Sequence, residues 1–369
     1  LVTLFVLTAA GPSVSDLKAD EVVVFYPSYL ARDGQEGPWK GTIQGKVHEP
    51  RDGASAALMR TALRKLLGIG GELTPDESSL FNSRAGEFLV DNQRGKTVVV
   101  QLGDRAFASE RSEADGRFRV EIGLAEGEAG DLLPFAARLD ADDPREFGGL
   151  LRLVSGEGLS VISDIDDTVK ESNVLDRDEL LANAFLRPYQ PVEGMPELYE
   201  SWAGQGVAVH YVTAGPWQLY PPLWEFIEEC GLPGVEIQMR DLRVKDRTVL
   251  SFFQDSQPYK IERIREILLR FPGRRFVLVG DSGEHDPQVY GTIAAEFPES
   301  VRGIFIRAVR AEHLDRERYR GWFGEIEESV PFGVSSFSTS SEFKDMQLRE
   351  LSDEEIAAAQ KLDEEDEFY

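Results

Sequence analysis

Cysteine and histidine are scarce in this chain of 369 residues. Its single cysteine, Cys230, excludes an internal disulfide and a cysteine-based zinc cluster. The four histidines do not follow zinc-motif spacing, which argues against a histidine-rich metal site. No apolar run reaches the roughly 20 residues that a membrane-spanning helix requires. The length therefore predicts two or three domains that are held by ordinary hydrophobic cores.

Basic residues are also few compared with acidic ones. Lys and Arg number 40 and Asp and Glu number 66, which gives a formal net charge of −26. This charge argues against general nucleic-acid binding, which requires a basic face, and against nonspecific adhesion to anionic membranes. A protein of this charge that acts on a phosphate must concentrate positive charge locally or recruit a cation.

The two ends of the chain differ in composition from the rest. Residues 1–10 are almost wholly apolar and precede small residues, a pattern typical of a secretory signal, although a buried first strand is the alternative. We therefore expect residues 1–19 to be a signal remnant or a flexible N-terminus. A secreted or periplasmic location follows, with a cytoplasmic or membrane-peripheral one as the alternative. Residues 335–369 are Ser-rich and then acidic, which predicts a flexible solvated tail rather than a site for a basic partner.

Residues 20–155 are predicted to form a β-sandwich-like domain. Runs of β-branched or alternating residues are separated by turn residues such as Gly34, Gly95 and Gly116, which is a strand-and-hairpin pattern. The leucine spacing predicts one helix, over residues 54–67. The expected strands are residues 21–26, 42–48, 97–103 and 118–124.

Residues 156–334 alternate between apolar runs of strand length and helical patterns. This alternation predicts an α/β fold, a Rossmann-like parallel sheet with helices on both faces. Ligands of such sheets bind outside the carboxyl ends of the strands, so the residues that end each strand are the candidates for function. The expected strands are residues 159–164, 207–213, 276–280 and 301–308, and the expected helices are residues 195–203, 219–230, 259–271 and 287–297.

Three carboxylates follow the first of these strands. If the strand continues, Asp164 and Asp166 share a face, because side chains alternate along a strand, and their repulsion calls for a divalent cation. Mg²⁺ prefers hard oxygen ligands of this kind. Taken alone, the motif could equally be an acidic loop or helix cap.

Polar groups recur at later strand ends and at one helix start. The hydroxyl of Thr213 and the amides that follow it can hold a phosphate oxygen. Lys260 opens a helix, where the helix dipole disfavours a cation, so phosphate binding is a reason for its presence. Asp281 and Asp286 form a second acidic pair beyond the third strand.

This ordered set resembles the motifs of the haloacid-dehalogenase-like phosphohydrolases. Residues 164–168 match their DxDxT motif, and residues 280–286 match their GDxxxxD motif. Thr213 and Lys260 match the hydroxyl and the lysine that lie between them in the chain. The joint match is specific, whereas each motif alone is weak.

The resemblance narrows to the catalytic domain of the actin-patch-type phosphatidate phosphatases. It extends over about residues 158–310, where the Gly-Pro-Trp segment after Thr213 and the sequence after Gly280 are characteristic. The second motif of that family reads Ser-x-Ser-Pro, so the chain has Gly215 in place of a second hydroxyl. The segments that carry the resemblance are residues 163–170, 191–195, 210–217 and 280–290.

The resemblance implies a haloacid-dehalogenase-like fold with a minimal cap and roles for individual residues. Asp164 would attack phosphorus to form an aspartyl-phosphate, and Asp166 would protonate the leaving group and then activate water. Thr213 and Lys260 would hold the phosphate oxygens. The implied Mg²⁺ would be bound by Asp164, Asp166 (through its carbonyl oxygen), Asp281 and Asp286.

The substrate is expected to be a phosphorylated lipid at a membrane surface. The segments after the first and second motifs are too short for a large cap, so the site is open. A basic run that includes Arg240 and Arg243 can bind phosphate, although a solvated loop is the alternative. With Thr168 and Gly215, these arginines are the candidate substrate-binding residues.

The family resemblance and neighbouring aromatic residues favour phosphatidate, which would be hydrolysed to diacylglycerol. Trp217, Tyr220 and Trp224 suit either a membrane interface or ordinary packing. A capless phosphatase for a phosphoprotein or a soluble ester, and a partner-binding scaffold, remain the alternative functions.

Overall fold

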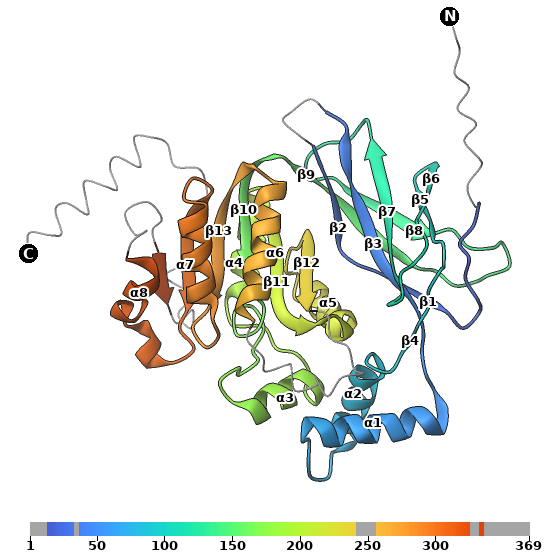
Figure 1. Ribbon diagram of the computed structural model, residues 1–369, viewed down its shortest axis with the longest axis horizontal. Helices are drawn as coiled ribbons and strands as arrows, with labels where there is room; N and C mark the ends of the chain where they lie inside the picture. Colours follow the sequence, from blue (N-terminus) through green and yellow to red (C-terminus); the bar gives the residue numbers. More distant parts are fainter. Residues whose placement is uncertain (1–12, 33–36, 241–255, 325–331, 336–369) are drawn as a thin grey trace, which may run out of the picture.

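The structure is a computed structural model, and it describes residues 13–32, 37–240, 256–324 and 332–335. The described residues form two sheets that share no strand (Figure 1). All strands up to Ser155 belong to a sheet of nine strands, and all strands from Glu157 onward belong to a sheet of six. The N-terminal sheet has one hydrophobic core, and the C-terminal sheet has one on each face.

The N-terminal sheet has the strand order β1-β3-β2-β9-β8-β5-β6, with β4 and β7 also paired to β3. Every pair is antiparallel except β2 with β9. The strands are β1 (Val22–Phe25), β2 (Ser28–Arg32), β3 (Trp39–Glu49), β4 (Asp91–Asn92), β5 (Val99–Leu102), β6 (Arg105–Ala108), β7 (Arg117–Leu124), β8 (Leu132–Ala137) and β9 (Gly148–Ser155). The expected sheet region is confirmed. Among the described residues, however, its strands form one hydrogen-bonded sheet and not the two separate sheets of a sandwich.

Helices α1 (Gly53–Leu67) and α2 (Pro75–Gly86) leave this sheet and pack elsewhere. The sequence predicted α1 but not α2, although Thr74 and Glu77 form a capping box at the start of α2. Helix α1 packs against α2, and α2 packs against α3 (Arg177–Phe185), which belongs to the C-terminal region of the chain. Their shared apolar cluster contains Leu63, Leu67, Phe81, Ala85, Phe88, Leu181, Phe185 and Leu219.

The C-terminal sheet has six parallel strands in the order β12-β11-β10-β13-β14-β15. Numbered from its first strand, this is the 3-2-1-4-5-6 order of a doubly wound fold. Successive strands are added toward one edge up to β12 and toward the other edge from β13, so the strand order reverses between β10 and β13. The predicted parallel sheet is therefore confirmed. Its strands are β10 (Glu157–Ser163), β11 (Ala208–Pro216), β12 (Glu236–Arg240), β13 (Gly273–Asp281), β14 (Val301–Arg307) and β15 (Phe332–Ser335). The sequence did not predict β12 or β15.

Helices cover both faces of this sheet. Ile162 of β10 faces one core with α6 (Gln257–Arg270) and α7 (Asp286–Glu296), whereas its neighbour Val161 faces another core with α4 (Met195–Gly204) and α5 (Tyr220–Glu229). This alternation is the period of two that a strand imposes. Helix α8 (Arg320–Phe323) adds Phe323 to the first core. In Figure 1 the carboxyl end of β10 points toward α1, α2 and α3.

The prediction of a secreted or periplasmic location has to be corrected. It was based on the apolar residues 1–10, which lie outside the described residues. None of the helices in the described part of the chain could span a lipid bilayer. The prediction therefore has no structural support and is withdrawn. The predicted acidic tail also lies outside the described residues, apart from Ser335 at the end of β15.

Candidate active site

Lys260 brings together carboxylates that follow two different strands. Its Nζ lies 2.9 Å from Oδ1 of Asp164, 3.1 Å from Oε2 of Glu284 and 2.6 Å from Oδ1 of Asp286. Asp164 directly follows β10, Lys260 lies in the first turn of α6, and Asp286 begins α7. Thr168 donates a hydrogen bond of 3.3 Å to Oδ2 of Asp164. These contacts lie at the reversal between β10 and β13, where a doubly wound sheet binds its ligand.

Asp281 completes this acidic group, and one of its carboxylate oxygens makes no hydrogen bond. The residue ends β13 and is fully buried. Its Oδ1 accepts hydrogen bonds from the amides of Gly283 and Glu284, while its Oδ2 has no hydrogen-bond partner. One carboxylate oxygen each from Asp164, Asp281 and Asp286 lies within 4.8 Å of the others. Buried carboxylates with an unpaired oxygen suit a hard divalent cation such as Mg²⁺.

The charges of this group are not balanced by the protein. Burial raises the pKa of Asp164 well above its usual range, and Asp286 adds to the rise while Lys260 opposes it. Burial and then Asp286 raise the pKa of Asp281 in the same way. Burial alone would lower the pKa of Lys260, but Asp164 and Asp286 outweigh it and raise that pKa. A bound divalent cation would favour the charged forms of the carboxylates.

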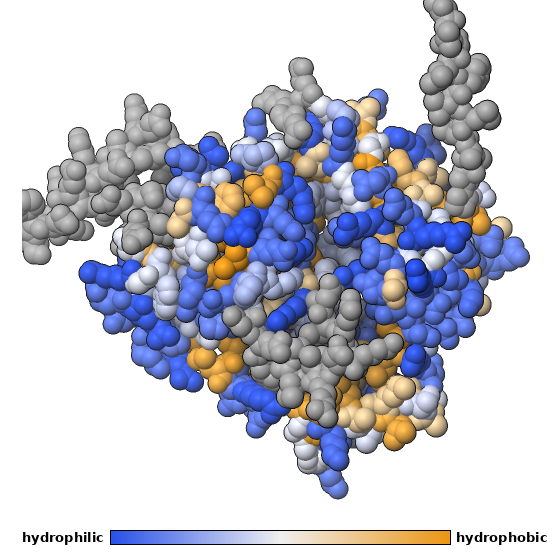
Figure 2. All heavy atoms as spheres, in the orientation of Figure 1, coloured by the Kyte–Doolittle hydropathy of each residue, from blue (hydrophilic) through white to orange (hydrophobic). Residues whose placement is uncertain are grey.

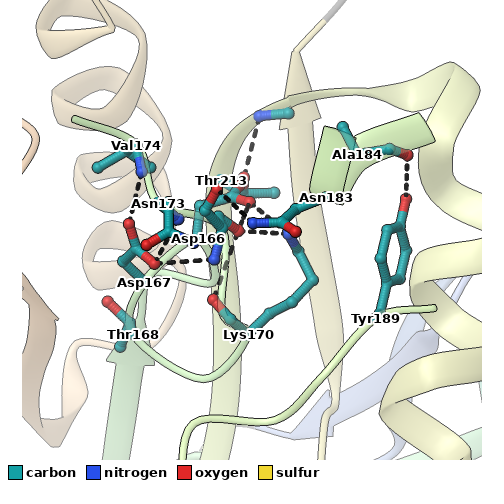
Figure 3. A network of polar contacts seen from close by, with 12 residues as sticks. Asp166, Asp167, Thr168, Lys170, Asn173, Val174, Asn183, Ala184, Tyr189 and Thr213 are labelled. Carbon is teal, nitrogen blue, oxygen red and sulfur yellow. Dashed lines mark hydrogen bonds and ion pairs between the residues drawn. The ribbon is translucent and has the colours of Figure 1, made fainter. Parts of the chain in front are cut away.

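Asp166 belongs to a second network, on the other side of the same loop. Figure 3 shows its carboxylate between Lys170 and Thr213. Oδ1 lies 2.8 Å from Nζ of Lys170 and accepts a hydrogen bond of 2.7 Å from Ser172, and Oδ2 accepts one of 3.0 Å from Thr213. Burial raises the pKa of Asp166, but Lys170 and the two hydroxyls outweigh it, so the net shift is downward. The carboxylate of Asp166 is therefore not part of the group of Asp281, and its predicted role as a metal ligand, through the backbone carbonyl oxygen, stays a prediction.

Asp167 shapes the loop that carries both networks. It has a positive φ of 56°, which is uncommon for a residue with a side chain. Its carboxylate accepts hydrogen bonds from the amides of Ser172, Asn173 and Val174 at 2.8, 2.9 and 2.6 Å (Figure 3). Because these bonds fold the chain back on itself, Asp164 and Asp166 point into different networks although only one residue separates them.

Of the predicted substrate-binding residues, Thr168 contacts Asp164 after β10, and Gly215 and Arg240 lie at the ends of β11 and β12. Gly215 donates its amide to Oγ1 of Thr213 at 2.9 Å, and a Cβ at this position would lie 3.2 Å from that oxygen. Arg240 ends β12 and lines a groove of about 480 Å³ between the two sheets, together with Trp217 and Tyr259. Arg243 lies outside the described residues.

Two of the aromatic residues after Thr213 pack inside the molecule. Trp217 and Tyr220 pack against Tyr26 of the N-terminal sheet region, with ring centroids 4.4 and 4.9 Å apart. Tyr220 also donates a hydrogen bond of 3.0 Å to the carbonyl of Phe25. These rings therefore hold the two halves of the molecule together, which is the ordinary packing that the sequence left open.

Sequence reasoning assigned no role to Lys170 or Glu284. Both lie within segments that carry the motifs, Lys170 four residues after Asp166 and Glu284 three residues after Asp281. The only signal was this proximity, because nothing in the sequence shows that Lys170 turns back toward Asp166. The structure adds both to the candidate site through Asp166 and Lys260.

Comparison with known proteins identifies the region that carries this site. Residues 159–308 match the family model described as "Phosphatidate phosphatase APP1, catalytic domain". This region belongs to the APP1 catalytic-domain family. The APP1-type catalytic domain thus runs from β10 to the end of β14, and it contains Asp164, Lys260 and Asp281.

Two fungal proteins are similar over a longer part of the chain. The protein named "Phosphatidate phosphatase APP1" of Saccharomyces cerevisiae is 31% identical over 249 residues, and an uncharacterised protein of Schizosaccharomyces pombe is 29% identical over 215 residues. The matches cover 63% and 56% of this chain. They span only 41% and 35% of the lengths of those relatives. The chain therefore spans less than half the length of either relative.

Solved structures add no argument about the fold. The PilB minor pilin from Streptococcus sanguinis overlaps 79% of this chain and 95% of its own, but with a TM-score of 0.27 and 11% sequence identity.

Proposed function

We propose that this protein is a Mg²⁺-dependent phosphohydrolase that removes the phosphate of a phosphatidate-like lipid through an aspartyl-phosphate. The observation that carries the proposal is the buried group of Asp164, Asp281 and Asp286 around Lys260, with an unpaired oxygen on Asp281. Such a group supports binding of one cation and one phosphate at adjacent positions. The membership of residues 159–308 in the APP1 catalytic-domain family supports the reaction type.

Asp164 is the proposed nucleophile. One of its carboxylate oxygens forms a bond to phosphorus as the bond from phosphorus to the lipid oxygen breaks. Asp166 gives its proton to that lipid oxygen, then takes a proton from the water that attacks the aspartyl-phosphate. Inorganic phosphate leaves and Asp164 is regenerated. Splitting one displacement into two easier ones is the gain of covalent catalysis.

The neighbours of these two carboxylates set their protonation for the reaction. Asp164 has to be charged to attack, and Lys260 at 2.9 Å favours that charge. Asp166 has to carry a proton, although Lys170 favours its charged form. The negative charge of an arriving phosphate opposes ionisation of Asp166, which supports proton donation only when substrate is bound.

The proposed metal site would be formed by Asp164 and Asp281, with Asp286 supporting them. Mg²⁺ would supply positive charge for the phosphate oxygens and for the charged form of Asp164. Lys260 and Thr213 are the protein groups that would hold the remaining phosphate oxygens. Asp286 would keep Lys260 in place through its contact of 2.6 Å.

A lipid substrate is favoured by the printed name of the yeast relative and by the groove beside the site. The groove of about 480 Å³ is lined by Arg117, Arg119 and Arg240, and also by the acidic Glu113, Asp115 and Glu262. Arginine side chains bind phosphate through two parallel hydrogen bonds. The N-terminal sheet contributes Arg117 and Arg119 from β7, so this region would take part in substrate binding.

The experiment is phosphate release by the full chain from phosphatidate in detergent micelles, with and without Mg²⁺. We expect turnover that requires Mg²⁺ and a loss of at least about 10³-fold in Asp164→Asn. Asp178→Asn, at an exposed carboxylate of α3, is the matched control and should retain activity. Release of phosphate only from a phosphopeptide or a soluble ester would show that the substrate is not a lipid. No release from any of them, or full activity of Asp164→Asn, would overturn the proposal.

A further inference from the structure

Helix α1 has two apolar faces, and only one of them is covered. Ala56, Leu63 and Leu67 are buried, and the two leucines pack in the cluster with α2 and α3. Leu58 and Leu66 are instead 72% and 46% exposed. An ordinary surface helix places one apolar stripe on the core and polar residues opposite.

The exposed face is a continuous stripe along the helix. Leu58, Ala62 and Leu66 recur every four residues, and Met59 lies beside them, so all four project from the same side. We call these four residues the α1 stripe. Figure 2 shows apolar side chains gathered at the lower edge of the molecule, where Figure 1 places α1. Among the described residues, no other helix carries two exposed leucines.

The charged side chains of α1 itself are all basic, although the acidic Asp52 and Glu72 flank residues 53–71 in the sequence. Residues 53–71 contain Arg60, Arg64 and Lys65 and no Asp or Glu, in a chain whose net charge is −26. Lys65 is exposed next to the stripe, and Arg64 closes the end of α1 by donating to the carbonyls of Ile69 and Gly71. An apolar face bordered by cations is typical of helices that lie in the interface of an anionic bilayer.

The C-terminal end of helix α1 is connected through α3 to the loop that carries Asp166. Arg177 of α3 donates a hydrogen bond of 3.2 Å to the carbonyl of Leu67. Asn183 of the same helix donates one of 3.1 Å to the carbonyl of Ser172, whose hydroxyl bonds Asp166. The helices α1 to α3 lie on the side toward which β10 ends (Figure 1). A surface bound to α1 would therefore adjoin the candidate active site.

We propose that the α1 stripe docks the protein on the surface of an anionic phospholipid bilayer. The proposal rests on the lipid substrate proposed above, because it supplies the surface on which that substrate is presented. The overall negative charge of the chain repels such a surface, so the cations of residues 53–71 and the apolar contacts of α1 have to overcome this repulsion. Binding is therefore confined to one face of the molecule.

The experiment is sedimentation of the full chain with vesicles of phosphatidylcholine that contain phosphatidylserine. Phosphatidylserine is anionic but carries no phosphomonoester, so binding is measured independently of turnover. We expect the double variant Leu58→Asp/Leu66→Asp to bind at least about tenfold more weakly, since two leucines that the bilayer would bury are replaced by charged side chains. Lys65→Glu should weaken binding by about fivefold or more, because each surface cation contributes at this scale.

A matched control uses exposed leucines on other faces. Leu269 and Leu314 are 64% and 44% exposed, and Leu269→Asp/Leu314→Asp should bind vesicles as the unchanged protein does. Failure of the unchanged protein to sediment, or equal binding by both double variants, would overturn the docking proposal. If the unchanged protein is a dimer that Leu58→Asp/Leu66→Asp dissociates and the control variant does not, and vesicle binding is unaltered, the α1 stripe binds a second copy of the chain. That result would also overturn the docking proposal.

Turnover in micelles separates this inference from the proposed function. Both double variants should release phosphate from micellar phosphatidate at the rate of the unchanged protein, because the substituted leucines lie outside the candidate active site. On phosphatidate in vesicles, only the α1 variant should be slow. Absence of micellar turnover in the unchanged protein would remove the proposed function, whatever the vesicle binding shows.

Discussion

Nζ of Lys170 lies 2.8 Å from Oδ1 of Asp166, and both groups are largely shielded from water. Removing one partner of such a pair leaves the other charge without compensation. We expect Lys170→Met to lower the free energy of unfolding by about 2 kcal/mol, less than for a fully buried pair because Asp166 remains partly exposed. Adding Asp166→Asn should restore much of that loss. Denaturant unfolding of the two single variants and the double variant measures the coupling, and strictly additive effects would contradict a direct pair.

Asp286 is the closest partner of Lys260, and its own role is to position that lysine. Its Oδ1 lies 2.6 Å from Nζ, and its Oδ2 accepts the amide of Asp281. We expect Asp286→Asn to lower kcat by about 10²-fold, the scale of losing one preorganised electrostatic contact. KM for a soluble phosphate ester should change much less. Steady-state kinetics separates the two parameters.

The matched control for this variant is Glu284→Gln, which removes a longer and more exposed contact of the same lysine. Glu284 lies 3.1 Å from Nζ and is 25% exposed. Its effect on kcat should be several-fold smaller than that of Asp286→Asn. Equal decreases in kcat for the two variants would mean that Asp286 contributes only its negative charge and does not position Lys260.

The strand ends of the C-terminal sheet could be predicted because their signals are local. Apolar runs followed by polar residues place Asp164, Thr213 and Asp281 at one edge of a parallel sheet. In the structure Asp164 directly follows β10, Thr213 lies near the end of β11, three residues before Pro216, and Asp281 ends β13. The strand rule of period two failed at Asp166. Asp167 adopts a positive φ directly after it, so the alternation of a strand does not continue and Asp166 turns to Lys170.

Contacts between segments that are distant in the chain could not be predicted from the sequence. Helix α1 was predicted from its leucines, but the pattern could not say which leucines would be covered, since the covering residues Leu181 and Phe185 come more than 100 positions later. Strands β12 and β15 were missed because each is short and defined only by its parallel neighbour. Strand identity at a sheet edge depends on pairing more than on propensity.

Arg84 of α2 joins the N-terminal helices to α3. Its guanidinium donates to the carbonyls of Ala184 and Arg187 at 3.0 and 2.8 Å and lies 3.9 Å above the ring of Tyr189. We expect Arg84→Met to destabilise the chain by about 2 kcal/mol, because hydrogen bonds from a charged donor are lost and two carbonyls stay buried. Hydrogen exchange of α2 and α3 should become faster. Arg105→Met, at an exposed arginine of β6, is the control and should leave exchange in these helices unaltered.

His48 of β3 makes stability depend on pH. Burial lowers the pKa of His48 from 6.5 to about 4, and Lys46 adds to the decrease. The unfolded chain therefore takes up a proton below pH 6.5, whereas the folded chain does so only near pH 4. The contribution of neutral His48 to the free energy of unfolding is fully present above pH 6.5. It is lost as the pH falls from 6.5 to about 4, by up to about 3 kcal/mol.

The variant His48→Gln has no such group and should lose less stability over the same interval. Unfolding at pH 7.5 and pH 4.5 gives the difference for each protein, and the comparison removes the contributions of other acids. His285→Gln, at an exposed histidine before α7, should behave as the unchanged protein. An equal loss of stability in all three proteins would exclude His48 as the source.

Asp281 offers a test of the proposed metal site that does not depend on turnover. Its pKa is raised by burial and by Asp286, so the charged carboxylate is disfavoured in the folded chain at neutral pH when no cation balances it. We expect Asp281→Asn to be more stable than the unchanged protein in EDTA, by about 1 kcal/mol or more. Mg²⁺ should reverse this order, since a ligand at 100 times its Kd adds about 2.7 kcal/mol to the protein that binds it. Thermal unfolding with EDTA and with Mg²⁺ measures both effects, and Asp178→Asn should follow the unchanged protein. If Mg²⁺ stabilised Asp281→Asn as much as the unchanged protein, the ion would bind without Oδ2 of Asp281.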